Sequence, residues 1–157
     1  MIEIIKIIDS KTEIEFVDEV SKLAEEAQNY LKSHKWCDKI IQGWLAEEWG
    51  YILSIFYFEL KPTQSSNADN YVWIIVGDLP PAYIDIQSAS NSFEALNAYV
   101  LIMEEWINNI KQGKSVDDCF PINVEPSIKY ADMLSSRINI IKSDFLPSLR
   151  QRGECCS

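Results

Sequence analysis

The sequence has little of what common catalytic sites need. It contains one histidine, His34, which any Ser/His/Asp or Cys/His site would have to use. This histidine stands between Lys32 and Lys35 near the end of an expected helix, with no nucleophile motif around it. We interpret it as a surface residue that closes the helix. The five glycines are isolated from one another, so the sequence has no Walker phosphate loop and no GxGxxG dinucleotide loop.

Cysteine is scarce as well. The four cysteines lack CxxC spacing, and two of them are adjacent: Cys37, Cys119, Cys155 and Cys156. Together with one histidine they cannot supply a usual zinc site, and they do not form a disulfide framework. We expect no metal and no cofactor, and a reducing cytoplasm as the compartment.

Long apolar runs are absent too. No uninterrupted run approaches the roughly 20 residues that cross a bilayer. Glu3 and Lys6 interrupt the apolar amino-terminal stretch, which has neither a basic leader nor a small-residue cleavage site. We therefore expect a soluble protein without a signal peptide. A length of 157 residues, 47% of them apolar, predicts a single domain at 1–150, followed by a frayed tail at 151–157.

Basic residues are outnumbered. The chain has 14 Lys and Arg against 24 Asp and Glu, which gives a net charge of −10. This charge repels nucleic acid phosphates and anionic membrane surfaces, so we expect neither as a partner. It attracts cationic proteins, of which basic nucleases are one class. Solubility alone also explains an acidic surface, and is the more common reason for one.

Three segments have the apolar spacing of amphipathic helices. They lie at about 14–33, 91–113 and 126–147. Thr12 with Glu15, and Asn91 with Glu94, have capping-box spacing at the first two starts. Pro147 is expected to end or kink the third helix.

Strand patterns fill the middle of the chain. They lie at 39–46, 51–60, 71–76 and 83–86, with a candidate turn at 47–50 and a polar loop at 62–70. The run at 51–60 is apolar on both faces, which predicts a central strand. Short connections predict antiparallel neighbours. The expected fold is α+β, an antiparallel meander of three to five strands packed with about three helices.

The strand at 71–76 stops abruptly at Gly77, and Asp78 and the double proline Pro80 and Pro81 follow. Such an end predicts a rigid, surface-facing corner. Asp78 could present a carboxylate to a partner or a substrate. It could instead accept hydrogen bonds from the amides of its own turn, while the prolines protect a sheet edge.

A family resemblance rests on several short motifs: WIIVGDLPPAY at 73–83, MEEW at 103–106, DDCFP at 117–121, and Tyr130, Ala131, Met133, Leu134 and Arg137. With them the chain, over about 36–146, resembles small acidic bacterial proteins similar to the immunity proteins of contact-dependent growth inhibition and other polymorphic toxin systems. The resemblance implies a non-enzymatic cytoplasmic protein that binds and neutralises a cognate toxin, in many cases a basic nuclease. Its motifs are structural, and they imply no catalytic residue.

For such a binder we place the contact on loop-borne acidic groups and one tyrosine: Glu47, Glu48, Asp78, Tyr83, Asp85, Asp117 and Asp118. The competing hypothesis is a small cytosolic enzyme or ligand-binding domain with a pocket near Asp78 and Tyr83, where a desolvated carboxylate could act as a base. Adjacent carboxylates such as Glu47 and Glu48 point apart on a strand, so we interpret them as solvated groups and not as magnesium ligands.

Overall fold

The computed structural model describes residues 5–8 and 18–155, with side chains for 20–150. Its elements in chain order are β1 (Ile5–Ile8), α1 (Asp18–Lys32), β2 (Cys37–Trp49), β3 (Leu53–Pro62), β4 (Tyr71–Gly77), β5 (Leu79–Asp85), α2 (Ser92–Lys111), α3 (Ile128–Ile140), the π-helical segment η1 (Ile141–Phe145) and α4 (Leu146–Cys155). The start predicted for the first helix, with Thr12 and Glu15, lies outside the described residues.

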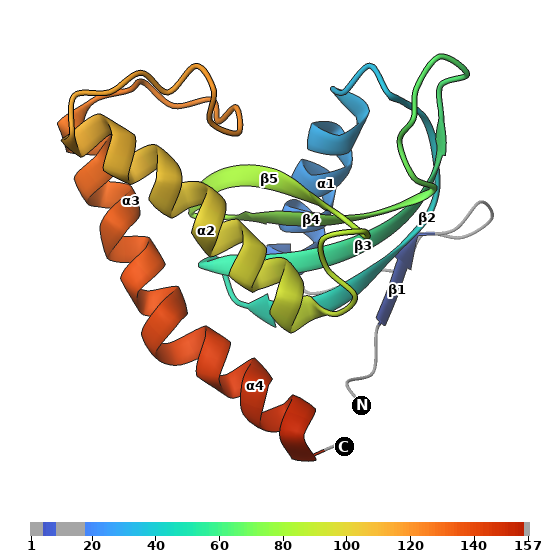
Figure 1. Cartoon of the computed structure of the whole chain (residues 1–157). Helices are drawn as coiled ribbons and strands as arrows, with labels where there is room; N and C mark the ends of the chain where they lie inside the picture. Colours follow the sequence, from blue (N-terminus) through green and yellow to red (C-terminus); the bar gives the residue numbers. More distant parts are fainter. Residues whose placement is uncertain (1–4, 9–17, 156–157) are drawn as a thin grey trace.

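The sheet is a five-stranded antiparallel meander in the order β1-β2-β3-β4-β5. Helix α1 covers one face (Figure 1). Helix α2 covers the other face, and α3, η1 and α4 run on from one another across its outer side. The predicted α+β class and antiparallel meander are confirmed. No helix in the described part of the chain is both long and apolar enough to span a bilayer.

The central strands separate two hydrophobic clusters. In β3, Ile55 faces the α2 side and Phe56 faces the α1 side, and both are fully buried. Alternate residues of a strand point to opposite faces, so a strand covered on both sides has to be apolar throughout. This is why the run at 51–60 shows no alternation. The predicted helical stripes are buried as well, for example Leu96 and Met103 of α2.

The turn between β2 and β3 lies later in the chain than the sequence predicts. Residues 47–49 belong to β2, and the chain reverses over 50–52. Gly50 supplies the turn with a φ of 56°. The prediction of a turn at 47–50 was wrong because Glu47 and Glu48 suggest an exposed loop, whereas Glu47 pairs with Ile55 inside the sheet.

The double proline lies inside a strand and does not end one. Pro80 and Pro81 belong to β5, the last strand of the sheet. An edge strand tolerates proline because its outward N–H groups have no ladder partner to lose. The corner predicted at 77–81 is therefore shorter, and consists of Gly77 and Asp78 alone.

Local signals fix the helix ends. The Asn91 side chain accepts a hydrogen bond from the Glu94 N–H at 2.8 Å, and the Glu94 carboxylate accepts one from the Ser90 N–H at 2.8 Å. The prediction that Pro147 ends or kinks the last helix is only partly right. A π-helical turn precedes Pro147 and the chain continues as α4, so part of the segment expected as a tail at 151–157 is helical.

Candidate binding site

Two hairpin turns meet at one end of the sheet. The Asp78 N–H, in the β4–β5 turn, donates a hydrogen bond to the Ile52 carbonyl of the β2–β3 turn at 3.1 Å. Gly77 makes this approach possible. Its φ is +153°, and a Cβ at this position would lie 2.2 Å from the Ile52 oxygen. The glycine therefore fixes where the Asp78 carboxylate stands.

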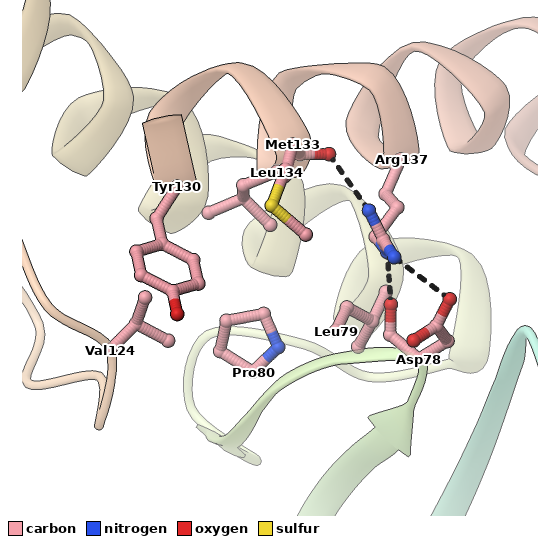
Figure 2. Close-up of a pocket in the computed structure, with 8 residues that line it drawn as sticks. All are labelled: Asp78, Leu79, Pro80, Val124, Tyr130, Met133, Leu134 and Arg137. Carbon is pink, nitrogen blue, oxygen red and sulfur yellow. Dashed lines mark hydrogen bonds and ion pairs between the residues drawn. The ribbon is translucent and has the colours of Figure 1, made fainter. Parts of the chain in front are cut away.

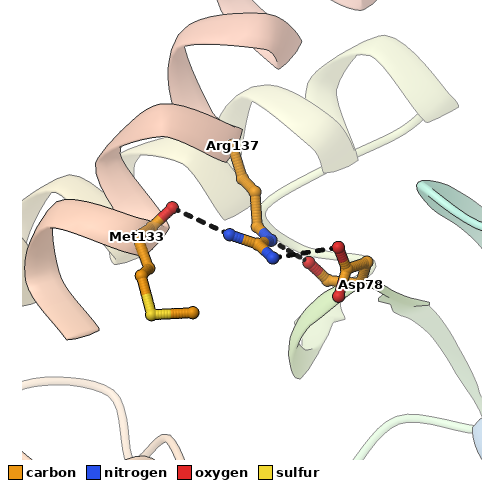
Figure 3. Close-up of polar contacts among 3 residues, drawn as sticks. All are labelled: Asp78, Met133 and Arg137. Atoms are coloured by element: carbon orange, nitrogen blue, oxygen red, sulfur yellow. Dashed lines mark hydrogen bonds and ion pairs between the residues drawn. The ribbon is translucent and has the colours of Figure 1, made fainter. Parts of the chain in front are cut away.

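Asp78 is held by Arg137 from helix α3 (Figure 3). One guanidinium nitrogen lies 2.9 Å from the carboxylate oxygen Oδ2, and Nε–H donates to the Asp78 backbone carbonyl. The remaining nitrogen, Nη1, donates to the Met133 carbonyl at 3.1 Å. The planar arginine fork thus joins the corner to α3 through two hydrogen bonds, and a third, to Met133, fixes the guanidinium on its own helix.

A pocket of about 250 Å³ opens beside this ion pair. Figure 2 shows the α3 side chains facing the β4–β5 corner across it. Its lining is apolar apart from the ion pair and the Tyr130 hydroxyl: Asp78, Leu79, Pro80, Val124, Tyr130, Met133, Leu134 and Arg137. Leu134 is 4% exposed and belongs to the core, whereas Met133 is 42% exposed. The pocket therefore has a rigid floor and an accessible apolar rim.

Exposed apolar side chains extend this region beyond the pocket. Tyr51 and Ile52, in the β2–β3 turn, are 54% and 46% exposed. Because Ile52 bonds to Asp78, they lie next to the corner. We call the group the turn-end surface, made of Tyr51, Ile52, Asp78, Tyr130 and Met133. Contiguous exposed apolar side chains rimmed by charge are typical of protein contact sites.

The geometry is poor for acid–base chemistry at Asp78. Its side chain is 72% exposed and paired with arginine. A desolvated base needs burial and no such partner. Tyr83 does not line this pocket, so the residues that were predicted to share one pocket lie apart.

Tyr83 instead belongs to an aromatic cluster near the carboxyl end of β5. Its ring lies 5.0 Å from His34, 5.1 Å from Trp36 and 4.9 Å from Phe120, measured between ring centroids. Burial, and then the charge of Asp85, raise the pKa of the Tyr83 hydroxyl. His34 lies just after α1, as predicted, with Nδ1 2.8 Å from the Tyr30 carbonyl.

The acidic residues predicted for the contact therefore separate. Asp78 belongs to the turn-end surface, and Asp85 lies beside Tyr83. Glu48 is exposed on β2, where it pairs with Ser54. Glu47 is 6% exposed, so we leave it out of any contact surface. Asp117 and Asp118 are exposed on the α2–α3 loop, whose Phe120 touches Tyr83.

Sequence reasoning missed the site contributions of Tyr130, Met133 and Arg137. A signal was present, because Tyr130 and Met133 are apolar residues outside the buried stripe of Ala131, Leu134 and Ile138. An apolar residue off the core stripe of a helix is a candidate contact residue. In the part of the chain described, no three His, Cys, Asp or Glu side chains are grouped closely enough to hold a metal ion.

Comparison with known proteins finds one family. The model described as "Domain of unknown function (DUF4826)" matches residues 15–143. No curated protein and no solved structure matches the chain. The matched segment contains every residue of the turn-end surface and of the aromatic cluster.

Proposed function

We propose that this chain, which belongs to the DUF4826 family, is a protein-binding protein whose partner is basic, and that it acts by occupying that partner and not by catalysis. The observation that carries the proposal is the turn-end surface, where exposed Met133 lines an open apolar pocket and exposed Tyr51 and Ile52 lie next to the Asp78 corner. Aromatic residues and methionine are enriched at the cores of protein interfaces.

Two features of the molecule set the two rate constants of binding. The pocket beside Leu134 accepts an apolar anchor side chain, and the burial of such an anchor mainly slows dissociation. The net charge of −10 steers a basic protein toward the molecule and mainly raises the association rate. Arg137 already neutralises Asp78, so the pocket itself adds little charge to the contact.

The specific form that we propose is an immunity protein that neutralises a cognate toxin, a basic nuclease, in the cytoplasm of the cell that makes both. The support is the acidity of the chain and the resemblance of its motifs to such proteins. Inhibition then needs only a stoichiometric contact that covers the toxin's active site or substrate face.

Photocrosslinking in the native host tests the surface directly. We expect p-benzoylphenylalanine in place of Met133 to give an adduct with a basic protein. The same substitution at Leu101 is the matched control, because Leu101 is 60% exposed on α2 and lines neither pocket. Adducts at both positions, or none at Met133, would remove the turn-end surface as the contact.

Growth rescue tests the toxin hypothesis separately. The chain is expressed with a toxin encoded next to its gene, and survival is scored for wild type, Met133→Asp and Leu101→Asp. We expect wild type and Leu101→Asp to protect, while Met133→Asp loses protection through about a hundredfold weaker binding. A toxin that kills despite wild-type chain, with no complex by calorimetry, would refute the immunity function.

A further inference from the structure

A second pocket, of about 280 Å³, is lined by the β3–β4 loop, by strands β4 and β5 and by Trp36. The β3–β4 loop and the β4–β5 turn lie at opposite ends of β4 (Figure 1). Its lining combines aromatic rings, small polar groups and two carboxylates: Trp36, Ser66, Asn67, Ala68, Asp69, Tyr71, Val72, Tyr83 and Asp85. None of these lining residues is shared with the first pocket. It is therefore a separate site.

The aromatic walls are the rings of Trp36 and Tyr83, which both pack on the α1 side of the sheet. The Tyr71 ring stacks on Tyr57, in the cluster on the opposite side of the sheet, and does not face them. Trp36 contacts His34 at 4.9 Å and Tyr83 at 5.1 Å. The walls therefore need little reorganisation to receive a ligand, and a preorganised site loses less conformational entropy on binding.

Backbone hydrogen bonds hold the rim. The Thr63 N–H donates to the Trp36 carbonyl at 3.0 Å, which ties the β3–β4 loop to the tryptophan. The Ala68 N–H donates to the Ser66 hydroxyl at 3.0 Å. These bonds hold the loop that carries Asp69, one of the lining residues.

The charge of the lining has one sign. Asp69 and Asp85 are carboxylates, and no lysine or arginine is among the lining residues. Neither aspartate has a salt bridge within the described part of the chain, in contrast to Asp78. An organic cation binds well where electron-rich ring faces lie next to carboxylates, because both attract positive charge. Ring faces also lose less hydration than polar groups do when a ligand covers them.

We propose that this pocket binds an organic ammonium group, with the rings of Trp36 and Tyr83 as aromatic walls and Asp69 and Asp85 as counter-charges. A quaternary ammonium fits best, because it is weakly hydrated and makes no directional hydrogen bonds that the pocket would have to satisfy. The group belongs either to a free small molecule or to a methylated lysine side chain of another protein. The inference stands independently of the proposed partner at the turn-end surface.

The test is a titration of the full chain followed by the indole N–H signal of Trp36 in ¹⁵N NMR spectra, with the signal assigned from Trp36→Phe. Choline is the probe, and 3,3-dimethylbutan-1-ol is its neutral isostere. We expect saturable shifts with choline and about tenfold weaker binding of the alcohol. Equal binding of both compounds, or no saturable shift with any cation, overturns the proposal.

Variants locate the site. Asp69→Asn with Asp85→Asn should weaken choline binding about tenfold, and Tyr83→Leu should weaken it several-fold, by roughly the value of one cation–π contact. Asp117→Asn removes an exposed carboxylate that does not line the pocket and should leave the affinity unchanged. Amide spectra establish that each variant is folded. Unchanged affinity in the folded Asp69 and Asp85 variant overturns the assignment.

A second arm distinguishes the two sources. A peptide containing trimethyllysine is compared with choline and with the unmodified lysine peptide. Tighter binding of the trimethyllysine peptide assigns the pocket to a modified protein partner, and tighter binding of choline assigns it to a free small molecule. If the unmodified lysine peptide binds with the same affinity as the trimethyllysine peptide and choline, the site is not selective for quaternary ammonium and the proposal is contradicted.

Discussion

The two ends of strand β5 bear two regions of opposite character. At its beginning, Asp78 is neutralised by Arg137, and the neighbouring surface is apolar and exposed. At its far end, Tyr83 is packed among other rings, and Asp85 and Asp69 have no basic residue in the lining around them. One short edge strand thus supports a neutral apolar surface and an anionic aromatic pocket.

The difference teaches that net charge alone does not locate a site in an acidic protein. The exposed carboxylate that stood out most in the sequence, Asp78, has its own cation. The carboxylates that could attract a ligand's charge are less conspicuous, and they stand beside tyrosine and tryptophan. At the turn-end surface apolar burial has to supply the affinity, whereas in the aromatic pocket charge and ring faces supply it.

The largest expected effect is on the free energy of unfolding, and it should differ between the floor and the rim of the first pocket. Leu134→Ala should lower the free energy of unfolding by about 3 kcal/mol, because Leu134 is 4% exposed and its truncation leaves a cavity in the core. Met133→Ala should lower it by less than about 0.5 kcal/mol, since that side chain is 42% exposed. Denaturant unfolding measures both, and equal losses would mean that the rim belongs to the core.

Substitution of two tyrosines, one in each region, tests whether the aromatic pocket is preorganised. Tyr83→Leu should lower the free energy of unfolding by about 1.5 kcal/mol, because it removes ring contacts with His34, Trp36 and Phe120. Tyr130→Leu is the matched control at the turn-end surface, with 37% exposure, and should change it by about 0.5 kcal/mol or less. If the control cost as much, the contrast between the two regions would fail.

The Asp78–Arg137 ion pair should contribute less to the free energy of unfolding than these side chains do. A double-mutant cycle with Asp78→Asn and Arg137→Gln is expected to give a coupling of about 0.5 kcal/mol, because the carboxylate is largely exposed to solvent. The coupling should shrink as salt rises from 0.05 to roughly 0.5 M. A large coupling that salt leaves unchanged would indicate a buried charge pair and contradict the exposed geometry.

The smallest effect appears only at high pH. The pKa of Tyr83 is raised in the folded chain above its ordinary value of 10.0, by burial first and then by Asp85. Its contribution to stability is therefore present below pH 10 and lost as the pH rises through the folded pKa. Tyr83→Phe should match wild type at pH 7 and lose less stability in alkaline unfolding experiments. Identical alkaline profiles would show that the pKa of this hydroxyl is not raised in the folded chain.

Local patterns predicted the fold well. The apolar stripe of α2 and the cap at Asn91 and Glu94 depend on residues close in the chain, and each agrees with the structure. The prediction at Glu47 failed because a carboxylate in a strand reads as a turn residue unless the pairing of the strand is known. Pro80 was misread for a related reason, since only its edge position allows proline in β5.

The sites were harder to predict because they join distant residues. Arg137 reaches Asp78 across 59 positions, and Trp36 meets Tyr83 from a different element. Periodicity shows which face of α3 is buried, but it does not show which turn the other face meets. The strand end at Gly77 marked Asp78 as a candidate in the sequence. Its ion pair with Arg137 and the adjacent pocket depend on how α3 packs, which the sequence pattern does not show.

The π-helical segment between α3 and α4 has a consequence for insertions and deletions. Leu146 N–H bonds to the Ile141 carbonyl, five residues back, so this turn holds one residue more than an α-helical turn. Removal of one residue within 141–145 would restore regular α-helix and leave the residues beyond on their present faces, because the wide turn only accommodates the extra residue. Leu149, which is 3% exposed, would then stay in the core. Removal of one residue from the regular part of α3 would instead rotate everything beyond by about 100°, so a deletion should be tolerated better in this segment than in the helix before it.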